Sequence, residues 1–445
     1  MNPKLKTALI RRSSEQGFAI PTAIGLGLVM LLVGATMIVR SQGDQVAAST
    51  QKATASSLQV AEAGVTKVQR FLDKYRILVT QPHKPSDNIY WKSYWTSLAN
   101  GCPATSPVLA ETTAFDSWIN IGSGTNPDRF RVISYTPPAT ASGDGTLVVE
   151  AELRDNNTTA RAIAKSRLKV IIPVERRIKP TYNPPGAWAT DFGLGNNKIV
   201  SDTVIDSSCS GSLNATELTQ ITATATGGTP KIINDAAIGM GSPPAVPTSP
   251  APITLPAITS DLTLPRLTGT TLDTPNAEGV YVYFVQKNGS GQSIDLSGNN
   301  KLVIQPGKKV TLYLEGNLNT QGGGTKIGHN CFDTNNPPDG EPDGGTTAVS
   351  GCVPTNFQIF GGAATTKIAL GGSNTIDAFI YAPNAVNSGV NGAAQVRGSV
   401  WVKQWDLANG NHTVIVQTAT WDNLPTFLLP PTLAPLTSWQ RQEVQ

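Results

Sequence analysis

Residues 11–42 read RRSSEQGFAIPTAIGLGLVMLLVGATMIVRSQ, and this stretch decides how the rest of the chain is arranged. Its first part is basic and polar. The 22 residues at 18–39 then carry no charged side chain. As a helix with a rise of about 1.5 Å per residue, this run would span roughly 30 Å, the hydrocarbon thickness of a bilayer. The run therefore predicts a membrane-spanning helix at the start of the chain.

Three kinds of N-terminal segment contain an apolar run of this sort. A secretory signal peptide has a shorter apolar core followed by a small-x-small cleavage site, whereas Arg40 stands at that place here. A single-pass anchor with its basic end in the cytoplasm fits the excess of Lys and Arg at the N-terminus. A leader that is cut before the apolar run fits the short basic segment and the Gly17-Phe18 junction. We favour the leader, because the apolar run continues without a break into a second helical segment.

That second segment shows a stripe of apolar side chains at helical spacing. Its members are alternately three and four residues apart, which is heptad spacing: Leu58, Ala61, Val65, Val68, Leu72, Tyr75 and Val79. We expect the C-terminal half of this stripe to pack on the protein's own next domain. A continuous helix over residues 22–78 would be roughly 85 Å long, with its N-terminal half in lipid and its C-terminal half outside.

The basic leader, Gly17-Phe18, the uncharged helix and the tetrapeptide Ala61-Glu62-Ala63-Gly64 together resemble the N-terminus of type IV pilin-like proteins, most closely that of PilX-type minor pilins. The resemblance covers about residues 1–80. It implies that prepilin peptidase cuts between Gly17 and Phe18 and that Phe18 is then methylated. It also implies a single-pass form in the inner membrane that later joins other pilins in a filament in the periplasm or at the cell surface.

Two positions of the helix need separate treatment. The fifth mature residue is Thr22, where major pilins have a glutamate that pairs with a neighbouring subunit's N-terminal amine. An uncharged fifth position resembles minor subunits at a filament tip. Glu62 lies beside the apolar stripe. It is either a solvated helix residue or the partner of a base on the head or on a neighbouring subunit, and the resemblance favours the paired interpretation.

Composition limits the kind of structure expected after the helix. The chain has 445 residues, enough for two or three domains. Only 15% of its residues are charged, and Gly (42) and Pro (32) are abundant, which favours turn-rich β structure. After Gly17 there remain 30 basic residues, 34 less the 4 of the leader, and 30 acidic residues, 31 less Glu15. A formal charge of zero argues against a nucleic-acid partner.

The chain has four cysteines, an even count that allows two disulfides and three connectivities in an exported protein. Cys331 and Cys352 flank one polar segment, so we expect them to pair, which leaves Cys102 for Cys209. There is no C-x-x-C motif and no Cys/His spacing typical of a metal site, so the sequence argues against bound zinc.

After a leader at 1–17 and a helix at 18–80, residues 81–175 are expected to form a small α/β head. Three runs in this segment are typical of strands, at 129–135, 146–153 and 161–172. The last two are joined by a polar, turn-rich connection, so we expect an antiparallel meander over the C-terminal half of the helix. The aromatic residues before these runs are expected to pack over the helix: Trp91, Tyr94, Trp95 and Trp118.

Residues 176–430 change character, with short apolar runs between Gly and Asn turns. The runs lie at 198–200, 202–205, 279–285, 293–296, 301–304, 309–314, 356–360, 366–370, 375–381, 398–402 and 412–416. The fold class is thus α+β, with a large all-β C-terminal domain that we expect to be a right-handed parallel β-helix, and a β-sandwich as the alternative. Residues 378–386 and 396–402 also resemble the β-helical domain of some pilin-like and surface-anchored bacterial proteins.

Two segments of this region are rich in proline. Residues 217–275 are also rich in Thr and Ala, and they predict a linker or surface strap with extended polyproline character. Residues 431–445 predict a tail that packs across the domain or hangs free.

The sequence contains few candidate metal-binding or catalytic residues. Hard oxygen ligands for Ca²⁺ cluster after Cys331, at Asp333, Asn335, Asp339, Glu341 and Asp343, although their spacing matches no EF-hand loop. The chain has three histidines and no nucleophile-elbow motif, and Asp295, Asp377 and Asp406 are scattered among the strands. We therefore expect no catalytic residues and no cofactor other than this calcium.

These features together predict a non-enzymatic minor pilin-like subunit of a type IV pilus, acting in filament assembly at the tip and in adhesion. The expected partners are other pilins, prepilin peptidase, the inner membrane and surface polysaccharide. One alternative is a pseudopilin of a type II-like or polysaccharide secretion system. Another is a membrane-anchored, carbohydrate-active β-helix enzyme.

Overall fold

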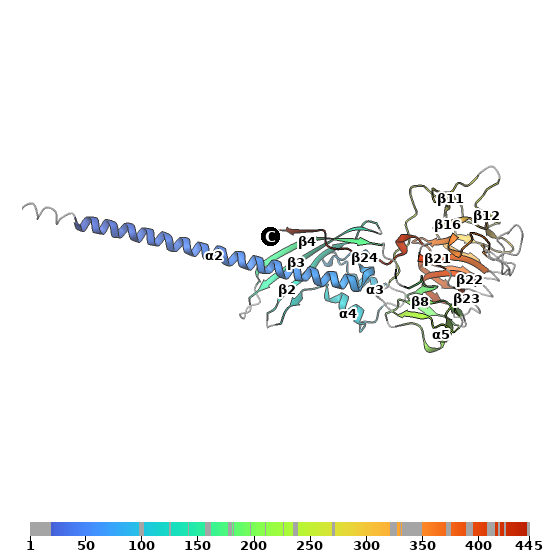
Figure 1. The fold of residues 1–445 in the computed structure, drawn as a ribbon, viewed down its shortest axis with the longest axis horizontal. Helices are drawn as coiled ribbons and strands as arrows, with labels where there is room; N and C mark the ends of the chain where they lie inside the picture. The colour runs from blue at the N-terminus through green and yellow to red at the C-terminus, as the bar shows by residue number, and fades with distance from the viewer. Residues whose placement is uncertain are drawn as a thin grey trace, which may run out of the picture.

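The computed structural model describes residues 19–97, 102–123, 126–140, 142–155, 162–176, 180, 182–195, 197–209, 211–225, 227–234, 239–268, 272–320, 327–329, 331, 349–370, 375–388, 395–406, 414–416, 419–421 and 424–442. Three parts follow one another along the long axis (Figure 1): a long helix, a head built on an antiparallel sheet, and a domain of parallel sheets. The C-terminus lies beside the head rather than at the far end.

The long helix, α2, runs from Ala19 to Lys74. Its 56 residues correspond to a length of about 84 Å. The predicted stripe is confirmed as its buried face, since Ala61, Val65 and Val68 are fully buried against the head. The helix ends a few residues earlier than predicted. A 3-10 turn, η1 (Arg76–Thr80), comes next, because Ile77, Leu78 and Val79 all turn into the head core.

The head contains the predicted antiparallel sheet. A 3-10 turn η2 (Pro85–Asp87) and two short helices, α3 (Trp91–Thr96) and α4 (Pro107–Ala114), precede the strands. The strands are β1 (Ile119–Ile121), β2 (Asp128–Thr136), β3 (Gly143–Arg154) and β4 (Ala162–Glu175). They pair antiparallel in chain order. Because alternate residues face one side, Leu147, Val149 and Ala151 of β3 pack on α2.

The C-terminal residues complete the head sheet. We expected a tail across the β-rich domain or a free end, but β24 (Thr432–Leu433) and β25 (Ser438–Gln442) both pair antiparallel with β4. Leu433 and Leu436 pack against the core beneath them. The entire parallel-sheet domain is therefore inserted between two neighbouring strands of the head, and the chain leaves and re-enters the head at the same sheet edge.

The inserted domain begins with β5 (Ala187–Ala189), β6 (Phe192–Gly193), β7 (Lys198–Val200), β8 (Thr203–Asp206), α5 (Ala215–Thr219), β9 (Ile221–Thr222), β10 (Lys231–Asn234), β11 (Ile253–Leu255) and β12 (Leu262–Leu264). It continues with β13 (Val280–Val285), β14 (Gln292–Asp295), β15 (Leu302–Ile304), β16 (Lys309–Leu314), β17 (Asn317–Thr320) and β18 (Ile327–Gly328). It ends with η3 (Pro354–Asn356), β19 (Phe357–Gly361), β20 (Ile368–Leu370), β21 (Thr375–Ser388), β22 (Gln395–Asp406), β23 (Val414–Val416) and the turn η5 (Thr426–Leu428).

The chain visits three parallel sheets in a fixed order. β13, β14 and β15 are followed by β16, β17 and β18, and each pairs in parallel with the strand three elements later. β19 and β20 then pair with β16 and β17. The Thr/Pro-rich insert is not only a strap, because β9, β10, β11 and β12 lie within it and join these sheets. Its apolar side chains at Leu255 and Leu264 are buried.

This domain has two cores, one on each face of its largest sheet. The inner core holds the inward-facing aliphatic residues of all three sheets, such as Leu312, Leu302 and Leu318. On the outer face, matching positions of neighbouring strands carry an aromatic row: Tyr313, Phe360, Tyr381, Trp401 and Trp188. Trp421, Leu424 and Leu428 of the C-terminal segment cover much of this row. The buried Arg176 guanidinium donates to the carbonyls of Phe427 and Leu429 and so holds that segment in place.

Candidate functional sites

The N-terminal half of α2 is exposed and apolar. The side chains of Ile20, Leu31 and Val39 are about two-thirds exposed, and no other part of the described chain covers them. The helix contains an 18-residue window of mean hydropathy 2.3 with at most two charged residues. Length and composition thus allow it to cross a membrane. Thr22, the fifth residue after the expected cut, lies on this half, whereas Gly17 and Phe18 lie outside the described residues.

The tetrapeptide Ala61-Glu62-Ala63-Gly64 marks the point where the helix enters the head. Ala61 is fully buried, and a Cβ added to Gly64 would lie 2.7 Å from two ring atoms of the fully buried Phe130. The glycine therefore allows the helix backbone to approach β2 closely. Glu62 points away from this contact and is exposed, and the structure shows no ion pair for it among the described residues of the head.

Replacing Gly64 by alanine is expected to weaken the docking of α2 on the head. Alanine favours a helix by about 1 kcal/mol over glycine, but crowding Phe130 costs about 1–3 kcal/mol, so we expect a net loss of about 1 kcal/mol. Urea unfolding of the full chain in detergent measures this change in the free energy of unfolding.

Gly43→Ala is the matched control, because a Cβ at Gly43 meets nothing within 4 Å, and this variant should be at least as stable as the parent. The double variant Gly64→Ala/Phe130→Leu should recover part of the lost stability, because leucine replaces the ring that the new Cβ would crowd. Equal stability of Gly64→Ala and Gly43→Ala would contradict the close contact.

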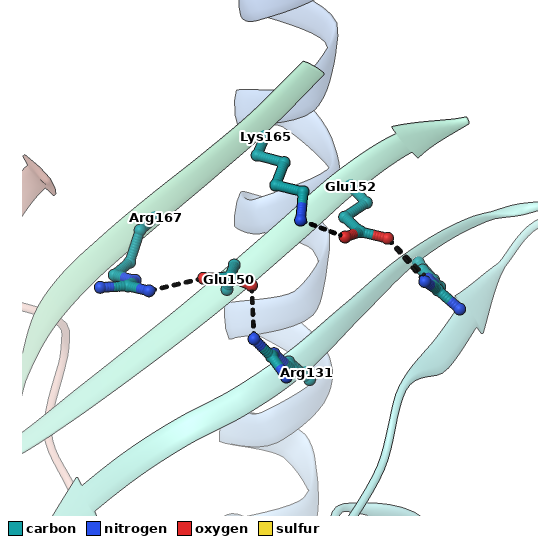
Figure 2. Close-up of polar contacts among 6 residues, drawn as sticks. Arg131, Glu150, Glu152, Lys165 and Arg167 are labelled. Atoms are coloured by element: carbon teal, nitrogen blue, oxygen red, sulfur yellow. Dashed lines mark hydrogen bonds and ion pairs between the residues drawn. The ribbon is translucent and has the colours of Figure 1, made fainter. Parts of the chain in front are cut away.

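The outer face of the head sheet carries two cross-strand rows of charge (Figure 2). Glu150 on β3 lies between Arg131 on β2 and Arg167 on β4, at 2.8 and 2.6 Å. Glu152 lies in the same way between Arg129 at 2.7 Å and Lys165 at 2.8 Å. The helix α2 passes behind the sheet in this view.

These two carboxylates are the buried members of the rows, since Glu150 is 2% and Glu152 5% exposed. Burial raises the pKa of Glu150, but the hydrogen bonds and charges of Arg167 and Arg131 outweigh it, so the pKa lies below its ordinary value. The pKa of Glu152 is lowered in the same way by Lys165 and Arg129. Both carboxylates are therefore ionised at neutral pH. They hold three strands in register rather than form a catalytic pair, because each is saturated by two cations.

Trp91, Tyr94 and Trp95 pack in the head core as predicted. The prediction was wrong for Trp118, which is not part of this core: the guanidinium groups of Arg129 and Arg131 lie 4.5 and 4.6 Å from its ring centroid.

Trp91 and Trp95 are fully buried, and Phe71 of α2 contacts Trp91 with ring centroids 5.5 Å apart. His83 stacks on Trp91, donates from Nε2 to the Phe115 carbonyl and accepts the Trp91 backbone N–H at Nδ1. Burial lowers the pKa of His83 to about 4. This histidine is therefore neutral and has a structural role.

Two disulfides occur in the structure. One joins Cys102 to Cys209 and links the α3–α4 connection of the head to the inserted domain, and the other joins Cys331 to Cys352. Sequence spacing predicted no Cys/His cluster, yet the structure brings His329 beside the second disulfide, with all three ligand atoms within 4.8 Å of one another. His329 is two residues before Cys331 in the chain, and the disulfide brings Cys352 to them. The sulfurs are bonded to each other, which leaves no thiolate for a metal.

The acidic candidates are distributed among separate contacts. Asp377 is buried, accepts the Cys331 N–H and pairs with Arg397, while Asp295 accepts the Asn319 side-chain amide at 2.9 Å. The side chain of Asp406 is outside the described part of the structure, as are the expected calcium ligands Asp333, Asn335, Asp339, Glu341 and Asp343.

A groove that the sequence did not predict crosses the outer face of the largest parallel sheet. It encloses about 550 Å³ over β13, β16 and β19. The Pro-rich segment around Pro247 and Pro250 forms part of its lining, as does the C-terminal segment around Pro425 and Phe427. The alternation within β13 and β16 identifies outward side chains, but nothing local in the sequence shows which strands are neighbours or which segments border the sheet.

Comparison with known proteins gives limited information. Residues 261–419 match the model of a domain of unknown function, DUF7305, which covers about a third of the chain. No curated protein matches the chain. A solved structure, the competence-associated pilin ComZ from Thermus thermophilus, aligns with 87% of this chain and 96% of its own at 11% identity, with a TM-score of 0.26. A TM-score of this size does not establish a common fold, so the assignment below rests on the helix and the head.

Proposed function

We propose that this protein is a non-enzymatic, pilin-like subunit of a type IV pilus-related filament. One observation carries the proposal. A single helix has an N-terminal half that is apolar and exposed and a C-terminal half that is buried in the head, with no break between them. A core helix would be buried throughout, and a plain membrane anchor needs no rigid continuation into the domain outside. A helix that first spans the membrane and later packs beside equivalent helices requires both halves.

The finer role extends this proposal. Prepilin peptidase would cut between Gly17 and Phe18, Phe18 would be methylated, and the uncharged Thr22 would suit a minor subunit at the tip. Glu62 would pair with a base on a neighbouring subunit, in keeping with its exposure. The inserted domain sits at the end of the molecule away from the N-terminal half of α2, which supports a role in contacts outside the filament (Figure 1).

We also propose that the inserted domain is a parallel β-helix. Its support is the pairing of β13 to β17 each with the strand three elements later, in three sheets, together with a continuous aliphatic interior. All strand pairs described between residues 187 and 416 are parallel, a pairing that stacked coils of one chain make.

N-terminal sequencing and intact mass of the protein from membranes test the filament proposal. We expect a chain that begins at methylated Phe18 in cells with prepilin peptidase, and an uncut chain in cells without it. Deletion of the gene should then reduce piliation. Loss of secretion with normal pili would place the subunit in a secretion filament instead. An intact Met1, or a cut beyond Val39, would overturn the filament assignment.

A further inference from the structure

The floor of the groove on the inserted domain is built from three neighbouring parallel strands. Val282, Thr311 and Gln358 lie side by side in register on β13, β16 and β19. Thr311 and Gln358 are paired on both sides, whereas β13 is paired with β11 only from Tyr283 to Val285. Because the backbone at Thr311 and Gln358 is already paired, a ligand that lies over these two residues is recognised by their side chains.

The polar side chains that line the groove are mostly neutral. The Asn356 amide donates to the Gly351 carbonyl at 2.8 Å, and the Gln358 amide donates to the Thr355 carbonyl at 2.9 Å. Both planar groups are thus fixed by the fold before a ligand arrives, which reduces the entropy lost on binding. The hydroxyl of Thr311 lies between them and β13 on the same floor.

The charge of the groove excludes most ionic ligands. Among the described lining residues the acidic and basic side chains are Glu278 and Lys309, one of each sign. Their charges cancel, so the groove offers no cationic cluster for phosphate, nucleic acid or an acidic polymer.

An aromatic group adjoins the polar floor. Tyr313 and Phe360 have ring centroids 5.3 Å apart, and Phe427 approaches Phe360 at 5.5 Å. All three line the groove. Apolar surface with a few fixed polar groups is typical of small-ligand sites. An extended molecule with both C–H faces and many neutral hydroxyls matches this combination.

We propose that this groove binds a neutral oligosaccharide. Amide and hydroxyl groups would pair with sugar hydroxyls, while the rings of Tyr313 and Phe427 would contact the C–H faces of the sugar rings. The strand spacing of about 4.8 Å is comparable to the length of one sugar unit, so neighbouring strands can contact neighbouring sugars. The proposal rests on the function above only for its setting at a cell surface.

A binding experiment with full-length protein in detergent tests it. Short neutral glucans, mannans, galactans and chitin fragments are presented on an array, with heparin and alginate fragments as acidic comparators, and hits are titrated by calorimetry. We expect at least one neutral class to bind. Gln358→Ala and Tyr313→Leu should each weaken binding about tenfold, the effect of losing one hydrogen-bonding or packing contact.

Thr254→Ala is the matched control, because Thr254 is exposed on the neighbouring strand β11 and does not line the groove. It should bind like the parent chain. Circular dichroism confirms that each variant is folded. No binding of any neutral class by folded protein, binding of acidic fragments only, or equal binding by all variants would overturn the proposal. N-terminal processing at Gly17 is measured separately, so failure of glycan binding and failure of the filament assignment are distinguishable.

Discussion

Glu150→Gln is expected to lower the free energy of unfolding of the head by about 2 kcal/mol. The substitution leaves Arg131 and Arg167 facing each other across β3 without the charge between them. Removing one partner of a fully buried ion pair costs about 3–5 kcal/mol. The loss expected here is smaller than that range, because the two arginine side chains are 42% and 31% exposed and keep contact with water. Hydrogen exchange of the β3 amides in urea measures the loss where it occurs.

The same contacts predict how head stability depends on pH. The folded pKa values of Glu150 and Glu152 lie below the ordinary value of 4.5. The stability that they provide is therefore complete above pH 4.5 and is lost as the pH falls through the folded pKa. Glu150→Gln should flatten this acid dependence. Asp87→Asn is the control, because the Lys84–Asp87 pair is exposed and should contribute no measurable stability. If the stability of Glu150→Gln fell at low pH as steeply as that of the parent chain, Glu150 would not be the source of this pH dependence.

A chain that ends at Pro430 is expected to lose about 3 kcal/mol of head stability. It lacks β24 and β25, and with them the half-buried Leu433 and Leu436 that pack on the head core. Burial of two such side chains contributes about this amount. The edge of β4 also becomes open to pairing with other chains, so we expect aggregation to increase. Hydrogen exchange of β4 amides and light scattering measure the two effects.

Gln440→Thr keeps β25 and serves as the control for the truncation. Its side chain lies on the exposed face of that strand, so stability should stay near that of the parent chain. The inserted domain should keep its own hydrogen-exchange protection in the truncated chain, because Arg176 still holds the carbonyls of Phe427 and Leu429. If the β4 amides of the truncated chain were as protected from hydrogen exchange as those of the parent chain, β24 and β25 would not be needed to stabilise the head sheet.

Local patterns predicted the elements of this fold well. The uncharged run and the alternating three- and four-residue spacing defined α2, because a helix shows the same face at that period. The runs at 129–135, 146–153 and 161–172 became β2, β3 and β4, and the short runs after residue 197 became strands of the inserted domain. The tail at 431–445 and the insert at 217–275 were interpreted as irregular, because two- to five-residue strands among prolines carry too little periodicity.

The sequence by itself determined which segments are helical or extended, which face of α2 is apolar, and that its first half can lie in a membrane. These properties depend on residues a few positions apart. Only the tertiary structure decided that the C-terminus closes the head sheet, that Glu150 and Glu152 each lie between two cations, and that a groove crosses β13, β16 and β19. Each of these depends on strand pairing between residues far apart in the chain, which side-chain periodicity does not encode.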